Sequence, residues 1–325
     1  MEAANTGYTL TGVSLISGVA CSQVNDDEIV DFAASDRPIW LHVQVDDVAA
    51  ATHLLRDRLH FHELAVEDAL SPNERPSTHE LDDALFLVVP ALAPEVEGGY
   101  IEISFFLRAN SLVSVSLGPC PAIQTWSVWF GKKDGHHATP ASHVLHTLID
   151  AIVDAYFPAL DALEDEVDDI TDRIFNGDTT HVANILRLKR RTIEFRRHLG
   201  PLREVLNSLL RRDQELISAD IRPYFADIYE HSLRLIEMIE IHRDALSSLL
   251  DIHLSTVSNN LNQVVKQMTV VSTVLMASAL IAGIYGMNFK MMPETEWVYG
   301  YPMSIGLMVV VALAIIAVFK RIKWI

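Results

Sequence analysis

The sequence has few cysteines and no excess of positive charge, and each shortage excludes a class of protein. Cysteine occurs only twice, at Cys21 and Cys120, with no CxxC spacing, so no disulfide framework is expected. Lys and Arg number 25 against 43 Asp and Glu, which makes the formal net charge −18. A nucleic-acid-binding surface needs a basic footprint, so nucleic acid is not an expected partner. The acidic balance instead suits a protein that handles cations.

Motifs of the common catalytic sites are missing as well. The chain contains no GxxxxGK[ST] phosphate loop, no nucleophile elbow and no HExxH pattern, so an enzyme is not expected. The first ten residues, MEAANTGYTL, lack the basic and apolar regions of a signal peptide. We therefore expect about the first 260 residues to remain in the cytosol.

Long apolar runs are present, and they lie near the C-terminus. Hydrophobic residues make up 50% of the chain although 21% of its residues are charged, so the apolar residues are unevenly distributed. Residues 268–287 and 301–319 carry no charge. Each run is long enough to cross a hydrocarbon core of about 30 Å, so the two runs predict a transmembrane hairpin.

Basic residues flank this hairpin on one side of the membrane. They are Lys266, Lys320, Arg321 and Lys323. By the positive-inside tendency, both ends of the hairpin face the cytosol, and the loop 288–300 lies outside.

Residues 1–140 have the pattern of a small cytosolic α/β domain. Runs rich in β-branched and aromatic residues predict strands at 39–45, 85–89, 100–108 and 112–117. Asp46 and Asp47 can cap a helix that continues through Leu59. His136 and His137 lie in a polar, breaker-rich loop, which indicates solvated side chains rather than a metal site.

From His143 onward the pattern is helical, and it ends in one very long helix. An acidic run occupies residues 161–172, and a basic run follows the break at Gly177. We expect these runs to be the solvated faces of two antiparallel helices. Between Pro223 and Gly283 there is neither proline nor glycine. At about 1.5 Å per residue, this stretch allows a rod of roughly 90 Å.

Two stripes on the long helix predict that several copies assemble. A heptad seam, the kind that joins helices in bundles, runs through Leu250, Leu254, Val257, Leu261, Val264 and Met268. A second stripe, called the pore stripe below, consists of Asn262, Val265, Met268, Ser272, Met276, Ala279 and Gly283. Two spans cannot enclose a channel alone, so we expect several copies around the pore stripe. Small hydroxyls in this span also fit packing against neighbouring helices, and that alternative stays open.

The residues at the end of the first span resemble a known family. YGMNF at 285–289, followed by MPE at 292–294, resembles the signature of the CorA family of magnesium transporters. LSTVSNNLNQVVKQMT before it, and YGYP and FKRIKWI after it, resemble the pore-helix lead-in, second span and tail of that family. The likeness is strong over residues 250–325 and looser back to about residue 60, through VEDAL, PLREVL and RPYFADIYEH.

The resemblance implies a fold and an assembly. It implies an α+β cytosolic domain at 1–140, a long helical stalk or funnel at 141–266, and a transmembrane hairpin at 267–325. Five copies would form a funnel-shaped homopentamer in the cytoplasmic membrane, with both termini cytosolic. The first span of each copy would line the pore. The selectivity filter at the outer mouth would consist of Gly286, Met287 and Asn288, with Glu294 in the outer loop.

The chemistry of Mg²⁺ fits this motif. Mg²⁺ gives up its water reluctantly and prefers octahedral oxygen coordination. A ring of neutral Asn288 amide oxygens can accept hydrogen bonds from the waters of a hydrated ion, whereas a ring of carboxylates would hold the ion too tightly. We expect Gly286 to be needed where the backbone turns out of the helix. Met268 and Met276 match positions at which the family narrows its pore with apolar side chains.

The resemblance also implies regulation by bound Mg²⁺. Asp68 and Asp227 match the two carboxylates of a cytosolic cation site between neighbouring subunits, and Glu67 and Asp150 match acidic positions nearby. Facing carboxylates repel one another unless a cation neutralises them. Mg²⁺ would therefore hold the subunits together, and its loss at low cytosolic concentration would open the pore.

Some positions depart from the family pattern and leave other functions open. Ala277 stands where many relatives have proline, Ala279 where threonine is common, and Thr295 where leucine is usual. These differences concern ion preference, so Co²⁺, Ni²⁺ or a Zn²⁺ transporter of the ZntB type stay possible. The rival from another class is a membrane-anchored helical sensor or scaffold, which would have no use for a GMN motif or a polar, methionine-bearing stripe.

Overall fold

The computed structural model describes most of the residues of the chain. These are residues 8–14, 20–21, 39–72, 75–81, 83–93, 99–120, 123, 140–175, 182–211, 214–288, 290, 292–294, 297–322 and 324. The chain divides into two compact units, Met1–Thr171 with Ala183–Ser247, and Asp172–Val182 with Ser248–Ile325. The predicted loop histidines His136 and His137 lie outside the described residues.

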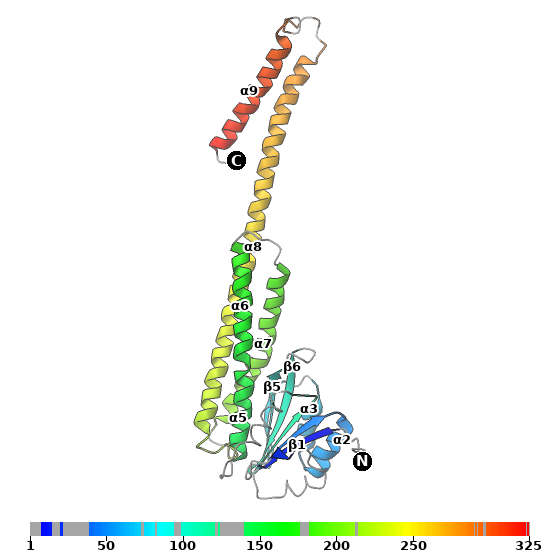
Figure 1. Ribbon diagram of the computed structural model, residues 1–325, viewed down its shortest axis with the longest axis vertical. Helices are drawn as coiled ribbons and strands as arrows, with labels where there is room; N and C mark the ends of the chain where they lie inside the picture. Colours follow the sequence, from blue (N-terminus) through cyan, green and yellow to red (C-terminus); the bar gives the residue numbers. More distant parts are fainter. Residues whose placement is uncertain are drawn as a thin grey trace. The chain divides into compact units, whose positions relative to one another are not determined.

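The first unit contains a seven-stranded mixed sheet in the order β2-β1-β3-β7-β6-β5-β4 (Figure 1). Its strands are β1 Tyr8–Ser14, β2 Ala20–Cys21, β3 Ile39–Val45, β4 Thr78–Glu80, β5 Leu85–Leu92, β6 Tyr100–Leu107 and β7 Ser111–Ser116. Among the described strands, only β3 and β7 pair in parallel. The four predicted strands are confirmed within a few residues at their ends. Strands β1, β2 and β4 were not predicted.

Helices cover both faces of this sheet. On one face lie α2 (Val48–Thr52), the π-helix η1 (His53–Arg58) and α3 (Glu63–Leu70), whose apolar residues share a buried core with β3, β5, β6 and β7. Helix α5 (Ala141–Asp154) packs on the other face, against β3, β5, β6 and β7. In a strand that is covered on both faces, the side chains that point to either face are apolar. Strand β5 is accordingly buried at nearly every position.

The helix predicted after β3 is confirmed with one difference. The Asp47 carboxylate accepts a hydrogen bond from Ala49 N at 3.1 Å, which is the expected N-cap. The second half of this segment, however, is the π-helix η1. A π-helix of six residues is too short to show a hydrophobic period in the sequence, so it could not be distinguished from an α-helix. Arg108 holds the end of this segment by donating to the carbonyl oxygens of Leu59 and His60.

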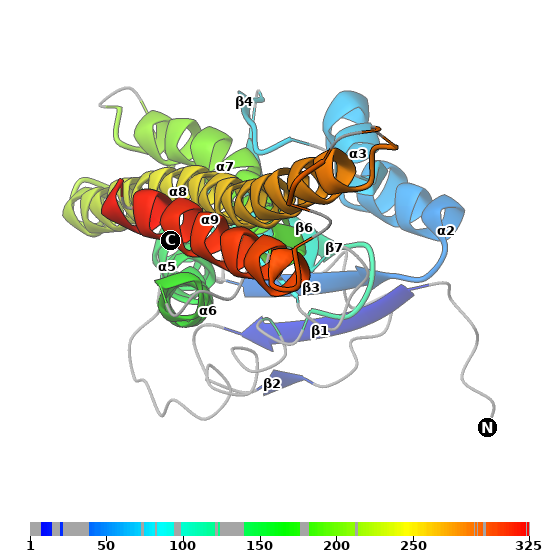
Figure 2. The ribbon, with the colours of Figure 1, turned by 90° about the horizontal axis from the view of Figure 1, so that it is seen from above.

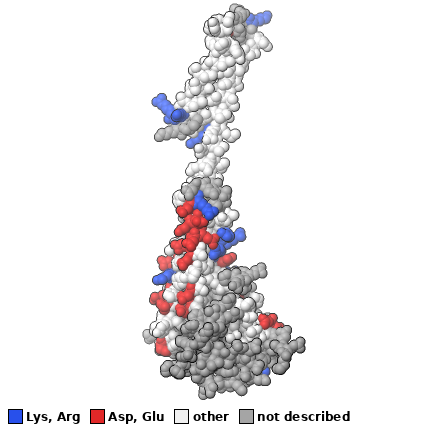
Figure 3. Space-filling model, viewed as in Figure 1, with Lys and Arg blue, Asp and Glu red and all other residues white. Residues whose placement is uncertain are grey.

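Three long helices follow α5: α6 (Tyr156–Phe175), α7 (Val182–Leu209) and α8 (Arg222–Tyr285). The predicted pairing of the acidic and basic runs is confirmed at Glu166 on α6, which binds Arg187 at 3.0 Å and also Arg191, both on α7. The other carboxylates of the acidic run stay exposed and form the red patch over α6 in Figure 3. Helix α8 has 64 residues, continues two residues beyond Gly283, and belongs to both units.

The second unit consists mainly of the last part of α8 and of α9 (Gly300–Arg321). These two helices are long and apolar enough to cross a membrane, and only 6% of the most apolar stretch of each is buried within the chain. Figures 1 and 2 both show α9 alongside the end of α8. Soluble proteins bury such surfaces, so the exposure here fits two helices that meet lipid or other copies of the chain.

Candidate functional site

Helix α8 ends in the Gly286-Met287-Asn288 turn. Gly286 N donates to Ala282 O at 2.9 Å, and Met287 N donates to Ile284 O at 3.2 Å, so the turn closes the last carbonyls of the helix. A Cβ atom at Gly286 would lie only 3.2 Å from Ala282 O. This contact is tight, and a shift of a few tenths of an ångström would relieve it; the backbone at Gly286 is not left-handed. Met287 and Asn288 are exposed beyond the turn.

The pore stripe is exposed along its whole length. All seven residues of the stripe are exposed in the isolated chain, with Val265 at 61%, Met268 at 67% and Met276 at 72%. The buried or half-buried residues of the first span instead include Val270, Val274, Ala277 and Ile281. At about 100° per residue, these four lie on nearly the opposite side of the helix from the pore stripe. Helix α9 therefore covers one face of α8, and the pore stripe is left on the other.

Two of the hydroxyl groups in the first span are bonded within their own helix. Thr269 Oγ1 donates to Val265 O at 2.8 Å, and Thr273 Oγ1 donates to Thr269 O at 2.7 Å. Such bonds satisfy the hydroxyl without water or a neighbouring helix. These two threonines therefore give no evidence for a wet face, and Ser272 is the hydroxyl that lies on the pore stripe itself.

The heptad seam is exposed before the membrane span begins. Leu254 is 59% exposed, Leu261 62% and Val264 51%, and all three precede the apolar run. Leu254 and Leu261 lie about four and two turns before the apolar run, outside the hydrocarbon core of a membrane. Large exposed apolar side chains in a row are typical of a surface that meets another protein, here as a helix seam.

Carboxylates from α5 and α8 converge in the first unit. Asp150 and Asp154 lie one turn apart on α5, and Asp227 and His231 lie one turn apart on α8. His231 Nδ1 is 3.7 Å from Asp154 Oδ1, and His231 Nε2 is 3.9 Å from Asp227 Oδ2. One ligand atom each from Asp150, Asp154 and His231 lies within 4.8 Å of the others.

The electrostatics of this cluster disfavour a charged Asp150. Burial raises the pKa of Asp150 above its usual range, and the negative charge of Asp154 raises it further. His146 and His231 act in the opposite direction, and Asp227 adds to the increase. A cation bound between these groups would remove the repulsion, so the arrangement can hold a divalent ion.

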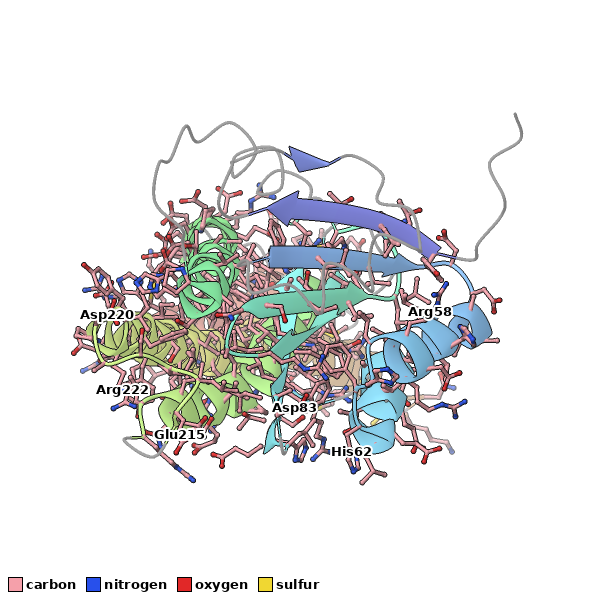
Figure 4. All side chains as sticks on the ribbon, turned by 90° about the horizontal axis from the view of Figure 1, so that it is seen from below. Arg58, His62, Asp83, Glu215, Asp220 and Arg222 are labelled. Atoms are coloured by element: carbon pink, nitrogen blue, oxygen red, sulfur yellow. The ribbon has the colours of Figure 1, made fainter. Side chains whose placement is uncertain are left out.

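The other two predicted ligands, Glu67 and Asp68, lie elsewhere in the first unit. Both are on α3, and Glu67 lines a cavity of about 310 Å³ with Arg56 and Glu63. In Figure 4, His62 at the start of α3 lies on the opposite side of this unit from Arg222, the first residue of α8. One chain therefore brings Asp150 and Asp227 together but does not bring either to Asp68.

A comparison with known protein families shows to which family this chain belongs. A family model described as "CorA-like Mg2+ transporter protein" matches residues 35–321. This chain belongs to the CorA family. The predicted resemblance is thereby confirmed over nearly the whole chain rather than over the transmembrane hairpin alone.

Individual relatives agree with this CorA assignment. The chain is 31% identical over 318 residues to the cobalt/magnesium transport protein CorA of Thermotoga maritima, a match that covers 92% of this chain and 86% of the relative. The complete structure of the CorA magnesium transporter from Methanocaldococcus jannaschii superposes with a TM-score of 0.84 over 100% of both chains, at 24% identity. The cytoplasmic domain of ZntB from Vibrio parahaemolyticus superposes with a TM-score of 0.62 over 78% of this chain and 99% of that one, at 17% identity. The two structural likenesses show the fold alone, and they confirm the α+β domain followed by long helices.

The CorA chain contains two cluster residues that sequence reasoning missed. Asp154 and His231 were not predicted as ligands, although each repeats a predicted carboxylate at the i, i+4 spacing of a helix, after Asp150 and Asp227 respectively. That spacing places both members of each pair on one helix face, and it is the signal that could have found them.

Proposed function

We propose that this CorA-family chain forms a homopentameric channel that moves divalent cations, with Mg²⁺ as the main ion. The observation that carries the proposal is the fully exposed pore stripe, which leads along α8 to the Gly286-Met287-Asn288 turn. Five copies that turn this stripe inward would enclose a path lined by Asn262, Val265, Met268, Ser272, Met276, Ala279 and Gly283. The exposed heptad seam supports assembly in register before the membrane is reached.

The proposed filter binds the hydration shell of the ion through hydrogen bonds rather than the bare ion. Asn288 is exposed directly after the closing turn of α8, so five copies can point neutral amide oxygens toward one axis. Neutral acceptors hold a hydrated Mg²⁺ weakly enough to release it. Glu294, exposed in the outer loop, would raise the local cation concentration. A membrane potential of about 100 mV supplies roughly 4.6 kcal/mol per divalent ion, so no nucleotide is needed.

The pore itself is proposed to gate by dewetting. Met268 and Met276 are flexible apolar side chains that lie two turns apart on the pore stripe, and five copies of each can form a narrow dry ring. We place both termini in the cytosol, because Lys266, Lys320 and Arg321 lie at the same end of the hairpin. We retain the division into 1–140, 141–266 and 267–325 as the functional domains, in the cytoplasmic membrane.

Regulation is proposed to use Mg²⁺ held between neighbouring copies. Asp227 and Asp150 of one copy would face Asp68 and Glu67 of the next, because α3 and the start of α8 lie on opposite sides of each first unit. In a ring, opposite sides of identical subunits meet. Mg²⁺ between them would cancel the repulsion and hold the ring closed, and its release would allow the ring to open.

The test is ion uptake into liposomes that contain the purified full-length chain. We expect uptake of Mg²⁺ that depends on an inside-negative potential and is shared to a smaller extent by Co²⁺ and Ni²⁺. Uptake of Zn²⁺ in preference to Mg²⁺ would assign the chain a ZntB-like role. The absence of any divalent flux from a folded, reconstituted oligomer would favour a membrane-anchored sensor and overturn the channel proposal.

A further inference from the structure

A polar cavity lies in the second unit, where α9 ends beside the lead-in to the first span. Its volume is about 550 Å³, and its lining residues are Asn259, Asn262, Gln263, Lys266, Gln267 and Trp324. Five of these lie at successive helical positions on one face of α8, and Trp324 comes from the tail after α9. The cavity therefore opens between two segments that are about sixty residues apart in sequence.

The tail that closes the cavity is held in place. Trp324 N donates to Phe319 O at 3.0 Å, and the rings of Trp324 and Phe319 lie 5.5 Å apart. Trp324 is 38% exposed, so part of its indole stays available at the cavity. The tail thus presents a fixed aromatic wall and an N–H donor.

The charged side chain that lines the cavity is the positive Lys266. The sequence contains no Asp or Glu between Asp251 and Glu294, and none after Glu296. Within the described residues, no ion pair joins a carboxylate to Lys266. Figure 3 shows the same pattern on its visible face, where blue side chains lie at the ends of the two spans and the surface between them is white.

The lining residues suit a phosphate group better than a cation. Lys266 Nζ, the side-chain amides of Gln263, Gln267 and Asn259, and the Trp324 indole can all donate hydrogen bonds to phosphate oxygens. The amide oxygens could also meet a hydrated cation, but the Lys266 ammonium in their midst would repel it. Lys266 follows Val265 and so points about 100° away from it around α8. The cavity therefore adjoins the pore stripe at Asn262 and otherwise faces away from it.

We infer that this cavity binds the phosphate headgroup of an anionic phospholipid. Lys266 stands two residues before the first span, and Trp324 stands three residues after α9, which is the depth at which headgroups lie and at which tryptophan and lysine are favoured. The inference rests on the proposed function only in requiring that the two apolar helices cross a bilayer. The lipid would tie the tail to α8 and so stabilise the cytosolic end of the hairpin.

The test measures the lipid that stays bound to the full-length chain. Wild-type protein is reconstituted in vesicles of equal parts phosphatidylglycerol and phosphatidylcholine, extracted in mild detergent, and its bound lipid is counted by native mass spectrometry. We expect phosphatidylglycerol to be retained several-fold over phosphatidylcholine, and K266Q to lose most of that preference. The matched control is K320Q, which removes the same charge at the same end of the hairpin from a residue that does not line the cavity. It should retain lipid as the wild type does.

Three outcomes would overturn the inference. If K266Q and K320Q lose the preference for phosphatidylglycerol equally, the chain has only a general attraction to anionic surfaces. If the wild type shows no preference between the two lipids, the cavity is filled by a neighbouring copy of the chain. Displacement of the lipid by millimolar inorganic phosphate would mean a site for soluble anions. The same spectra count the protein copies, so a failure of the assembly proposed above is seen separately from a failure of the lipid site.

Discussion

His231 on α8 lies 3.7 Å from Asp154 on α5, measured from Nδ1 to Oδ1. The contact joins residues that are 77 positions apart in sequence, and it brings Asp150 and Asp227 into one cluster. Burial and the Asp154 charge raise the pKa of Asp150, so an ionised Asp150 is disfavoured in the isolated chain. Mg²⁺ shared with the next copy would favour the ionised carboxylate and so link the two copies.

Removing one carboxylate from each side of the proposed regulatory site should weaken closure by Mg²⁺. In D68N/D227N, two charge-assisted contacts are lost, each worth roughly 1.5–3 kcal/mol when fully formed. We expect the Mg²⁺ concentration that protects the cytosolic part from protease to rise at least about tenfold, the equivalent of about 1.4 kcal/mol. The measurement is limited proteolysis over a Mg²⁺ titration.

The control for that variant is D161N/D165N, which makes the same charge change at two exposed carboxylates of α6. Its protection curve should match that of the wild type. If the curve of D68N/D227N also stays unchanged, Asp68 and Asp227 are ordinary surface carboxylates and the gating proposal is wrong.

N288A should abolish transport while leaving assembly intact. The substitution removes an amide oxygen from an exposed residue after the end of α8, so the helix and the loop length are kept. Each lost acceptor removes about 1 kcal/mol of hydrogen bonding to the hydrated ion, and five losses in one ring should lower Mg²⁺ flux by more than about tenfold. Liposome uptake and native mass are measured on the same preparation. Wild-type flux through a folded N288A oligomer would show that the turn is not the selectivity element.

N288D should also lose flux, but for the opposite reason. The side chain keeps its shape and gains a negative charge in every copy, so an entering divalent ion should be held too firmly to leave. Repulsion within the ring should raise the pKa of the new carboxylates, so part of the flux should return as the external pH is lowered. Uptake measured between pH 7 and pH 5 distinguishes this variant from N288A, whose flux should not respond in that way.

Placing a charge on the heptad seam should break the oligomer. Leu261 is 62% exposed in the isolated chain and lies outside the apolar span, so we expect another copy of the chain to pack against it. L261D would lose roughly 1.5–3 kcal/mol of burial in each copy and add five facing charges. Native mass spectrometry should show monomers or small oligomers in place of a species of five times 36.3 kDa. N260K, one residue away and off the seam, should remain assembled, and a monomeric wild type would contradict the proposal.

His42 should make the first unit less stable as the pH falls. Its Nδ1 lies 3.0 Å from Ser114 Oγ, and Ser114 Oγ also accepts the Trp40 indole N–H. Burial lowers the pKa of His42 to about 4, against about 6.5 for an exposed histidine. Between about pH 6.5 and about pH 4, the histidine therefore takes up a proton in the unfolded chain but not in the folded one. The free energy of unfolding is thus at its full value above about pH 6.5 and falls as the pH drops toward about 4. The loss amounts to about 3 kcal/mol.

The measurement is the urea unfolding midpoint between pH 7 and pH 4.5. H42N should be less stable at pH 7, because its amide cannot reproduce the imidazole contacts, and its stability should fall less steeply as the pH is lowered. H79Q changes an exposed histidine and should keep the wild-type slope. Equal slopes for H42N and the wild type would mean that His42 is already accessible to protons.

Several features could be predicted from the sequence because they depend on local or periodic patterns. The four strands and the Asp47 cap follow from neighbouring residues, and the long helix follows from sixty residues without proline or glycine. The π-helix η1 and the short strands β2 and β4 could not be predicted, because short elements are stabilised by the partner they pack against rather than by their own sequence. Strand β1 has seven residues, as β3 has, and was missed. The role of Gly286 stays a prediction: α8 ends at Tyr285 as expected, and a Cβ atom at Gly286 would lie 3.2 Å from Ala282 O.

For the candidate sites, the sequence by itself determined which residues are candidates. The tertiary structure decided which of these residues lie close together. The Gly286-Met287-Asn288 motif, the apolar runs and the pore stripe can all be read from helical spacing, because their members lie within a few turns of one another. Only the fold shows that Asp150 and Asp154 meet Asp227 and His231, that Asp68 lies away from them, and that Trp324 closes a cavity at Lys266. The reason is physical: the hydrophobic effect has no direction, so which distant residues meet is decided by how whole helices pack.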